Sequence, residues 1–392
     1  MRIGIDGIPL ATPKTGIGHY TFELARSLAA ARGADEFELL APVPVSRQLE
    51  EACGEDGGGG LPANLRASAP RTGGHLRRRW WSFGLPLHLR ERDFSLYHGT
   101  NYNVPPWAGC PAVVTVHDLS LLLHPETHEA RLVELARRRL PVMTRTAAHV
   151  LTDSESVRAE IRGLLGVEPE RVTAVPLAPR RAFRPASPEE VDETRNRLGV
   201  TDDFILFVGT VEPRKNLLAL VRAFDLLTRE TSLRPQLVIA GRKGWLTEEL
   251  YELVERSPTA SRILFTGYVT DAELRALYTS CRLFVYPSLY EGFGLPPLEA
   301  MACGAPVVAS RIPVIEETAG AEAARLVAPA DSEALAGALA ELLTDEAARS
   351  ELAARGRERA AEFTWERTAR QTLGVYERVM AEHRSRRRAA TG

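Results

Sequence analysis

The stretch Ser288-Leu-Tyr-Glu-Gly-Phe-Gly-Leu-Pro-Pro-Leu-Glu-Ala-Met-Ala-Cys-Gly-Ala-Pro-Val-Val-Ala-Ser310 decides the fold of the second half of the chain. The apolar run before it, Leu283-Phe-Val-Tyr286, predicts a buried parallel strand. The segment Glu291-Gly-Phe-Gly294 predicts a turn, and the residues after it predict a helix from about Pro297 to Cys303. Because Val307-Val-Ala309 predicts the next strand, we expect one strand-turn-helix-strand unit.

Two carboxylates in this unit, Glu291 in the turn and Glu299 in the first helical turn, are candidate ligand-binding groups. Backbone N–H groups at a helix start favour anions, so the turn offers donors for a phosphate. A carboxylate has two acceptor oxygens, which suits the vicinal hydroxyls of a ribose. As two isolated residues, they are explained better as a solvated turn acid and a helix N-terminal acid. The surrounding sequence therefore has to decide between the two interpretations.

The length and composition predict a soluble protein of two domains. A chain of 392 residues exceeds one ordinary core, and 44% hydrophobic with 26% charged residues is typical of globular proteins. A net charge of −2 predicts no nucleic-acid partner, and no apolar run approaches the roughly 20 residues of a membrane span. The N-terminus lacks a signal-peptide pattern, so we expect a cytoplasmic protein. The four cysteines lack C-x-x-C spacing, which argues against a zinc site.

Strands and helices alternate along the chain, which predicts an α/β fold of two doubly wound, Rossmann-like halves with parallel sheets. The unpatterned residues 176–187, rich in proline, alanine and arginine, predict a linker. We expect a first domain over residues 1–180 and a second over residues 181–363. Residues 364–392 are expected to form a C-terminal helix and a basic tail.

Glycine and polar residues follow the carboxyl ends of several predicted strands. Ligands of doubly wound proteins bind at these ends, and with two halves we expect the site in the cleft between them. The candidates are Gly16 and Gly18, His117 and Asp118, Gly209, Arg214 and Lys215, and Glu291.

Arg214 and Lys215 place two cations at a strand-to-helix turn, where they can hold a diphosphate and stabilise it as it leaves. Alone, this pair would be interpreted as surface charge beside a helix, but Gly209 before it and the glutamates downstream favour a site. No D-x-D pair occurs in the chain. Such pairs commonly hold a nucleotide diphosphate through a metal, so we expect no metal and no other cofactor.

The sequence from Glu291 to Ser310 resembles the E-x7-E signature of retaining GT-B-fold glycosyltransferases, glycosyltransferase family 4 (glycosyl transferases group 1). Glu212-Pro-Arg-Lys-Asn216 matches the family's basic pair. The resemblance covers nearly all of the second domain and selected loops of the first. It implies a GT-B fold whose last helix, about Thr364–Arg384, returns to the first domain. It also implies transfer of a hexose from a nucleotide-diphospho-sugar, with the acceptor bound by the first domain.

The resemblance also implies roles for individual residues. His117, Arg214, Lys215 and Glu291 are the expected catalytic residues. The expected donor contacts are Glu299 with the ribose; Glu291, Gly292, Phe293 and Gly294 with the sugar; the Leu295 amide with the phosphates; Gly267, Tyr268 and Val269 with the base; and Gly16, Gly18 and Gly209.

In the first domain, Thr15-Gly-Ile-Gly-His-Tyr20 resembles the family's glycine loop that approaches the donor phosphate. A dinucleotide-binding loop is the weaker alternative, because Thr21 replaces the third glycine of that fingerprint. His117 is expected to hold a hydroxyl of the donor sugar, and the alternative is a histidine bonded to its own loop. The candidate acceptor contacts are His19, His98, Asn101 and Asp118.

The segments 15–21 and 115–126 are similar to those of bacterial mannosyltransferases that build surface polysaccharide, which favours GDP-mannose over UDP-sugars. The acceptor is a glycan or a lipid-linked saccharide. Two alternatives stay open: a GT-B-fold UDP-sugar epimerase and a non-catalytic nucleotide-sugar-binding protein. The basic segments Arg77–Trp81 and Arg384–Arg388 fit either solvated surface or peripheral contact with the inner face of the plasma membrane.

Overall fold

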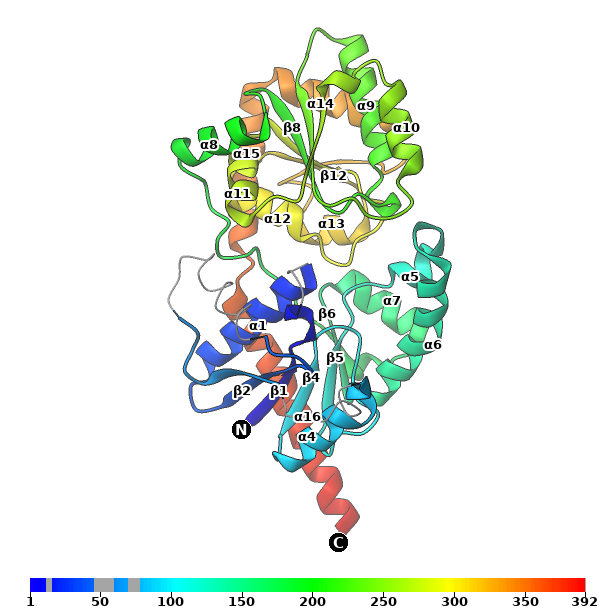
Figure 1. Cartoon of the computed structure of the whole chain (residues 1–392), viewed down its shortest axis with the longest axis vertical. Helices are drawn as coiled ribbons and strands as arrows, with labels where there is room; N and C mark the ends of the chain where they lie inside the picture. The colour runs from blue at the N-terminus through cyan, green and yellow to red at the C-terminus, as the bar shows by residue number, and fades with distance from the viewer. Residues whose placement is uncertain (12–15, 46–59, 70–77, 392) are drawn as a thin grey trace. The chain divides into compact units, whose positions relative to one another are not determined.

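The computed structural model describes residues 1–11, 16–45, 60–69 and 78–391, which divide into two compact α/β units (Figure 1). Unit 1 comprises Met1–Leu119, Glu134–Leu177 and Thr364–Gly392, and unit 2 comprises Ser120–Val133 and Ala178–Phe363. Ser120–Val133 was expected in the first domain, residues 1–180, but it belongs to unit 2. The physical reason is its packing: the Trp245 indole N–H donates to the Thr127 carbonyl oxygen at 2.8 Å, and His128 stacks on Trp245.

Unit 1 is built on a seven-stranded parallel sheet with the order β3-β2-β1-β4-β5-β6-β7. Its strands are β1 (Arg2–Asp6), β2 (Glu36–Leu40), β3 (Leu65–Ser68), β4 (Leu96–Gly99), β5 (Ala112–Thr115), β6 (His149–Thr152) and β7 (Val172–Ala174). Every residue of β4, β5 and β6 is buried, as expected for central parallel strands that are covered on both faces.

Helices lie on both sides of this sheet (Figure 1). They are η1 (Ile8–Leu10), α1 (Gly16–Ala31), the π-helix η2 (Trp80–Gly84), α4 (Leu85–Glu91), α6 (Ala130–Thr146), α7 (Glu155–Leu165), η4 (Pro169–Arg171) and α16 (Trp365–Thr391). α6 continues through Pro141.

Unit 2 is built on a six-stranded parallel sheet with the order β10-β9-β8-β11-β12-β13. Its strands are β8 (Phe204–Val208), β9 (Gln236–Ala240), β10 (Ile263–Gly267), β11 (Leu283–Tyr286), β12 (Val307–Ser310) and β13 (Arg325–Val327). Its helices are α5 (Ser120–Leu123), η3 (Pro125–Thr127), α8 (Pro188–Leu198), η5 (Pro213–Lys215), α9 (Leu217–Glu230), α10 (Glu248–Arg256), η6 (Ala260–Arg262), α11 (Asp271–Ser280), α12 (Leu295–Ala302), α13 (Pro313–Thr318), α14 (Ser332–Thr344) and α15 (Glu346–Ala361).

The strand order gives each sheet one topological switch point, where successive strands are added in opposite directions. In unit 1 this point lies between β1 and β4, and in unit 2 it lies between β8 and β11. Ligands of open α/β sheets bind outside the carboxyl ends of the strands at such points. The predicted α/β fold with two Rossmann-like halves is therefore confirmed.

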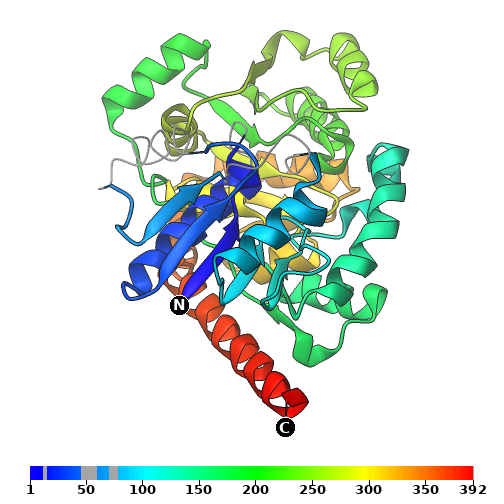
Figure 2. The same ribbon diagram turned by 60° about the horizontal axis from the view of Figure 1, so that its bottom comes forward.

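The long helix α16 packs on α1 of unit 1, and its end extends away from the sheet (Figure 2). A buried hydrogen-bond chain joins it to the sheet. The Tyr376 hydroxyl lies 2.6 Å from His98 Nδ1, His98 Nε2 lies 2.7 Å from Thr115 Oγ1, and Thr115 Oγ1 lies 2.9 Å from the Tyr20 hydroxyl. The basic stretch Arg384–Arg388, expected as a tail beyond the helix, is part of α16.

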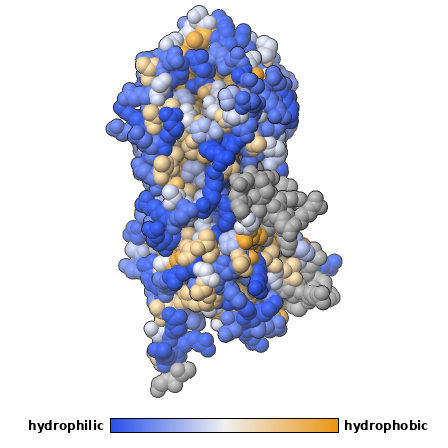
Figure 3. All heavy atoms as spheres, turned by 90° about the vertical axis from the view of Figure 1, so that its left-hand side faces the viewer, coloured by the Kyte–Doolittle hydropathy of each residue, from blue (hydrophilic) through white to orange (hydrophobic). Residues whose placement is uncertain are grey.

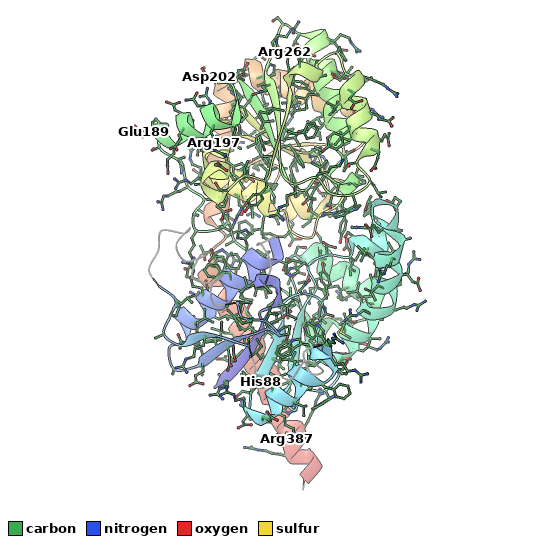
Figure 4. All side chains as sticks on the ribbon, in the orientation of Figure 1. His88, Glu189, Arg197, Asp202, Arg262 and Arg387 are labelled. Atoms are coloured by element: carbon green, nitrogen blue, oxygen red, sulfur yellow. The ribbon has the colours of Figure 1, made fainter. Side chains whose placement is uncertain are left out.

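Charged side chains cover much of the surface. The face in Figure 3 is mostly hydrophilic, with hydrophobic residues scattered among polar ones. On unit 2, Glu189, Arg197 and Asp202 point outward (Figure 4). Within the described ranges, no helix combines the length and the apolar character that crossing a bilayer requires.

Tyr376→Phe should destabilise the protein because it leaves the buried His98 Nδ1 without its partner, at a cost of about 1–3 kcal/mol. Urea unfolding followed by tryptophan fluorescence measures this change.

Tyr97→Phe is the matched control, since the Tyr97 hydroxyl is also fully buried in unit 1 but has no hydrogen-bond partner among the described residues. Its removal should leave stability unchanged or raised. Equal losses in the two variants would show that the Tyr376–His98 bond does not stabilise α16.

Candidate active site

The carboxyl end of β8 places two cations at the switch point of unit 2. The strand ends at Val208, and the chain then forms the short turn η5 and reverses at Asn216, which has a φ of 57°. The Asn216 side-chain amide donates to the carbonyl oxygens of Pro287 at 3.1 Å and Pro329 at 2.6 Å. Asn216 thus ties the turn to the segment after β11 and directs Arg214 and Lys215 toward that segment.

Glu291, after β11, accepts hydrogen bonds from both cations. Arg214 Nη1 lies 3.0 Å from Glu291 Oε2, and Lys215 Nζ lies 2.5 Å from Glu291 Oε1. Arg214 Nη2 also donates to Glu212 Oε1 at 2.6 Å, and Lys215 Nζ donates to the Tyr286 hydroxyl at 2.8 Å. The structure thus brings together three of the predicted catalytic residues. An ammonium has three donors, so the partners found within the described chain leave one Lys215 donor for a ligand.

Burial and charge act in opposite directions on this cluster. Burial raises the pKa of Glu291, but the charges of Arg214 and Lys215 outweigh it and lower the pKa to about 2. Burial lowers the pKa of Lys215, and the Glu291 carboxylate opposes that change. Glu291 is therefore ionised at neutral pH and holds the buried Lys215 and the partly buried Arg214 at the end of the sheet.

The start of α12 offers few backbone N–H donors. Gly294 has a φ of 92°, and a Cβ at this position would lie 2.7 Å from Ile315 Cδ1, so only glycine fits. α12 begins at Leu295, which is earlier than the predicted start at about Pro297. Because Pro296 and Pro297 have no N–H, the Leu295 amide is the one N–H donor among the first three residues of the helix. An anion at this helix start would depend on Leu295 and the preceding turn.

Glu299 lies inside α12 and is 3% exposed. Both of its carboxylate oxygens accept hydrogen bonds from Arg180, from Nε at 2.7 Å and from Nη2 at 3.1 Å. Arg180 Nη1 also donates to Asp271 Oδ1 at 2.7 Å. The residue predicted to bind the ribose is therefore a buried carboxylate held by an arginine from the predicted linker.

The predicted base-binding segment follows β10 at the same edge of the sheet. Gly267 takes a φ of 71°, Tyr268 is 59% exposed, and Val269 is buried. The Arg242 guanidinium lies 4.6 Å from the centre of the Tyr268 ring. An exposed aromatic ring beside a cation offers a flat surface for a nucleotide base.

In unit 1, His117 follows β5 and is 8% exposed. Its Nδ1 lies 2.7 Å from Asp153 Oδ2, and its Nε2 lies 2.8 Å from the Thr100 carbonyl oxygen. Ser154, and not Asp153, caps α7, which leaves Asp153 for the histidine. A carbonyl oxygen and a carboxylate both accept, so the ring has an acceptor at each nitrogen and both nitrogens donate. Burial lowers the pKa of His117, but Asp153 outweighs it, and the pKa is raised.

One acceptor-binding prediction is wrong. His98 is completely buried, both of its ring nitrogens have partners inside unit 1, and burial lowers its pKa to about 3. It is a neutral core residue and cannot reach an acceptor. His19, Asn101 and Asp118 are each half-buried, and the Tyr102 hydroxyl lies 2.9 Å from the Asp118 backbone nitrogen.

The predicted glycine loop forms the first turn of α1, with Gly16 exposed and Gly18 buried. Thr15 lies outside the described residues, as does Arg77 of the basic segment Arg77–Trp81. Within that segment Trp80 is 3% exposed, so its indole belongs to the core and is not available to a membrane.

Four residues of these clusters were missed in the sequence: Asp153, Arg180, Glu212 and Tyr286. Glu212 and Tyr286 lie inside the motifs quoted above, so their position beside predicted site residues could have identified them. Arg180 and Asp153 contact residues that are 119 and 36 positions away in the chain, and no local pattern indicates such partners.

Known proteins resemble the whole chain. Family models match it over residues 14–178 (Glycosyltransferase Family 4) and residues 189–359 (Glycosyl transferases group 1). O-antigen chain mannosyltransferase B of Escherichia coli is 35% identical over 96% of this chain and 99% of that protein.

Solved structures share the fold at low identity. Sucrose-phosphate synthase from Thermosynechococcus elongatus superposes with a TM-score of 0.72 at 22% identity, over 97% of this chain and 100% of that one. Anabaena HepE, in complex with UDP and glucose, gives a TM-score of 0.71 at 20% identity, over 96% and 99%. The predicted family is thereby confirmed: the chain belongs to glycosyltransferase family 4 and is a glycosyltransferase of the GT-B fold.

Proposed function

We propose that this protein is a retaining mannosyltransferase that transfers mannose from GDP-mannose to a glycan or lipid-linked acceptor in surface-polysaccharide synthesis. The reaction takes place in the cytoplasm, with peripheral contact at the inner face of the plasma membrane where the acceptor is lipid-linked. The name of the E. coli relative, an O-antigen chain mannosyltransferase, supports the choice of sugar. UDP-sugars are the alternative donors.

The observation that carries the proposal is the buried cluster of Arg214, Lys215 and Glu291 at the β8–β11 switch point. Two cations in one turn at the carboxyl end of a parallel strand suit a diphosphate. Glu299 and Tyr268 lie at the same edge of the sheet, one suited to a ribose and the other to a base. Together they provide a group for each part of a nucleotide diphosphate.

In the proposed reaction, the acceptor oxygen bonds to C1 of the donor sugar on the face from which the diphosphate departs. The bond between C1 and the phosphate oxygen breaks, its electron pair stays on that oxygen, and the same oxygen takes the acceptor's proton. Arg214 and Lys215 stabilise the charge of the departing diphosphate without a metal. Glu291, whose pKa is about 2 and whose oxygens are held by both cations, positions these cations and is neither the acid nor the nucleophile.

The donor screen tests the proposal directly. Thermal shift and product release are measured with GDP-mannose and with UDP-, ADP- and dTDP-sugars, each with and without EDTA. We expect GDP-mannose to give the largest shift and EDTA to leave transfer unchanged. If no nucleotide sugar binds, the transferase proposal fails. Turnover of UDP-N-acetylglucosamine without an acceptor would indicate an epimerase, and binding without turnover would indicate a non-catalytic protein.

Lys215→Ala should lower kcat about 100- to 1000-fold, because it removes one charge that stabilises the leaving diphosphate. Initial rates of GDP release measure this change, and circular dichroism checks the fold. Arg222→Ala is the matched control, since Arg222 is an exposed cation on α9, directly after the same turn. Full activity of Lys215→Ala would show that the site is elsewhere.

Asp153→Asn should lower the pKa of His117, because the opposing carboxylate is removed and burial remains. In the proposed site the imidazolium acts through its positive charge on the departing diphosphate, because both of its N–H groups already have acceptors in unit 1. Wild-type kcat should therefore fall as pH rises through the raised pKa of His117, and this fall should move to lower pH in the variant. The stability that the raised pKa of His117 contributes depends on pH in the same direction as kcat. It is fully present below about pH 6.5 and is lost as the pH rises above the folded-state pKa.

The pH profile of kcat, with NMR titration of the ring, checks this prediction. Asp192→Asn, at an exposed position on α8, is the control. An alkaline limb that does not move in Asp153→Asn would exclude His117 as its origin.

A further inference from the structure

Arg180 belongs to the stretch predicted as a linker, but its side chain lies against the second acid of the E-x7-E motif. Its side chain is 11% exposed, and its guanidinium carbon lies 4.2 Å from the centre of the buried Phe183 ring. Nearby, the Ala186 backbone N–H donates to Thr279 Oγ1 on α11 at 3.0 Å. The linker is thus held on unit 2 by side-chain and backbone contacts.

The guanidinium joins two carboxylates that come from different helices. It donates two hydrogen bonds to Glu299 of α12 and one to Asp271, the first residue of α11. Burial lowers the pKa of Arg180, but the two carboxylates, Glu299 first, outweigh it, so the pKa is raised and the cation is permanent. Arginine presents its donors in a rigid plane, and a two-point contact fixes the orientation of the carboxylate opposite.

This contact determines which acceptor sites of Glu299 a ligand can use. A carboxylate offers about four lone-pair positions, and Arg180 occupies one on each oxygen. The remaining position on each oxygen lies on the outer edge of the carboxylate, where it can accept a hydrogen bond from a ribose hydroxyl. Without Arg180 the carboxylate would be free to turn this position away from the hydroxyl.

We propose that Arg180 is a positioning residue for nucleotide recognition: it orients Glu299 so that the carboxylate accepts a hydrogen bond from the 2′-hydroxyl of the donor ribose. This role rests on the proposed function and adds a specificity determinant outside the E-x7-E motif. Arg180 acts through Glu299 and has no contact with the reacting atoms.

The test compares ribose with deoxyribose. Calorimetry measures the binding of GDP and 2′-deoxy-GDP, with UDP and 2′-deoxy-UDP as a second pair, to the full chain and to Arg180→Gln, Arg180→Lys and Arg184→Ala. The wild type should prefer the ribonucleotide about tenfold or more, since one hydrogen bond to a charged acceptor is lost in the deoxy form. In Arg180→Gln this preference should fall below about threefold, and kcat should change less than KM.

Arg180→Lys keeps the charge but not the two-point contact. Its preference for the ribonucleotide should therefore lie between those of the wild type and Arg180→Gln. If Arg180→Gln does not fold, the same comparison is made with Arg180→Lys. Arg184→Ala is the control because Arg184 is an exposed arginine of the same linker, and its preference should equal that of the wild type.

The outcomes separate the two proposals. If the Arg180 variants bind ribonucleotide and deoxyribonucleotide more weakly than the wild type by the same factor, Arg180 has only a structural role. The positioning proposal is then wrong. If the wild type binds ribonucleotide and 2′-deoxyribonucleotide equally well, Glu299 does not bind the 2′-hydroxyl, and the positioning proposal is also wrong although nucleotide binding stands. If the wild type binds no nucleotide, the proposed function itself fails.

Discussion

The ion cluster of Glu291 with Arg214 and Lys215 sets the geometry at the carboxyl edge of the unit 2 sheet. Removing charges from water costs several kcal/mol for each ion, and this cost is offset only where each charge has close partners of opposite sign. Lys215 and Glu291 are both more than nine-tenths buried, so each needs close partners of opposite charge. The loops after β8 and β11 must therefore stay in register, and the neighbouring order of these strands keeps them adjacent.

The two glutamates of the motif have separate cationic partners and therefore separate roles. Glu291 binds the cations that are suited to a diphosphate, whereas Glu299 binds Arg180, which lies outside the motif. The two cationic groups come from segments far apart in the chain, the turn after β8 and the linker. The two glutamates of one sequence motif thus belong to two separate ionic clusters at one edge of the sheet.

Unit 1 shows how partners decide the charge of a buried histidine. His98 lies in β4 and His117 follows the neighbouring strand β5, and both are at least nine-tenths buried. His98 lies between two hydroxyls, which accept or donate equally well, so burial prevails and the ring is neutral. His117 lies between a carboxylate and a carbonyl oxygen, which only accept, so the pKa of its ring is raised. The first is a structural link to α16, and the second is a histidine whose protonated form is favoured by its partners.

The sequence by itself determined the fold class, most helix and strand positions, and the group of Arg214, Lys215 and Glu291. These follow from local patterns: apolar periodicity, glycine and proline placement, and charges after strands. Only the tertiary structure decided which candidates have partners. It placed His98 and Trp80 in the core, assigned Ser120–Val133 to unit 2, and added Asp153 and Arg180 to the candidate residues. The physical reason is that burial and ionic pairing depend on residues distant in the chain, which no local pattern specifies.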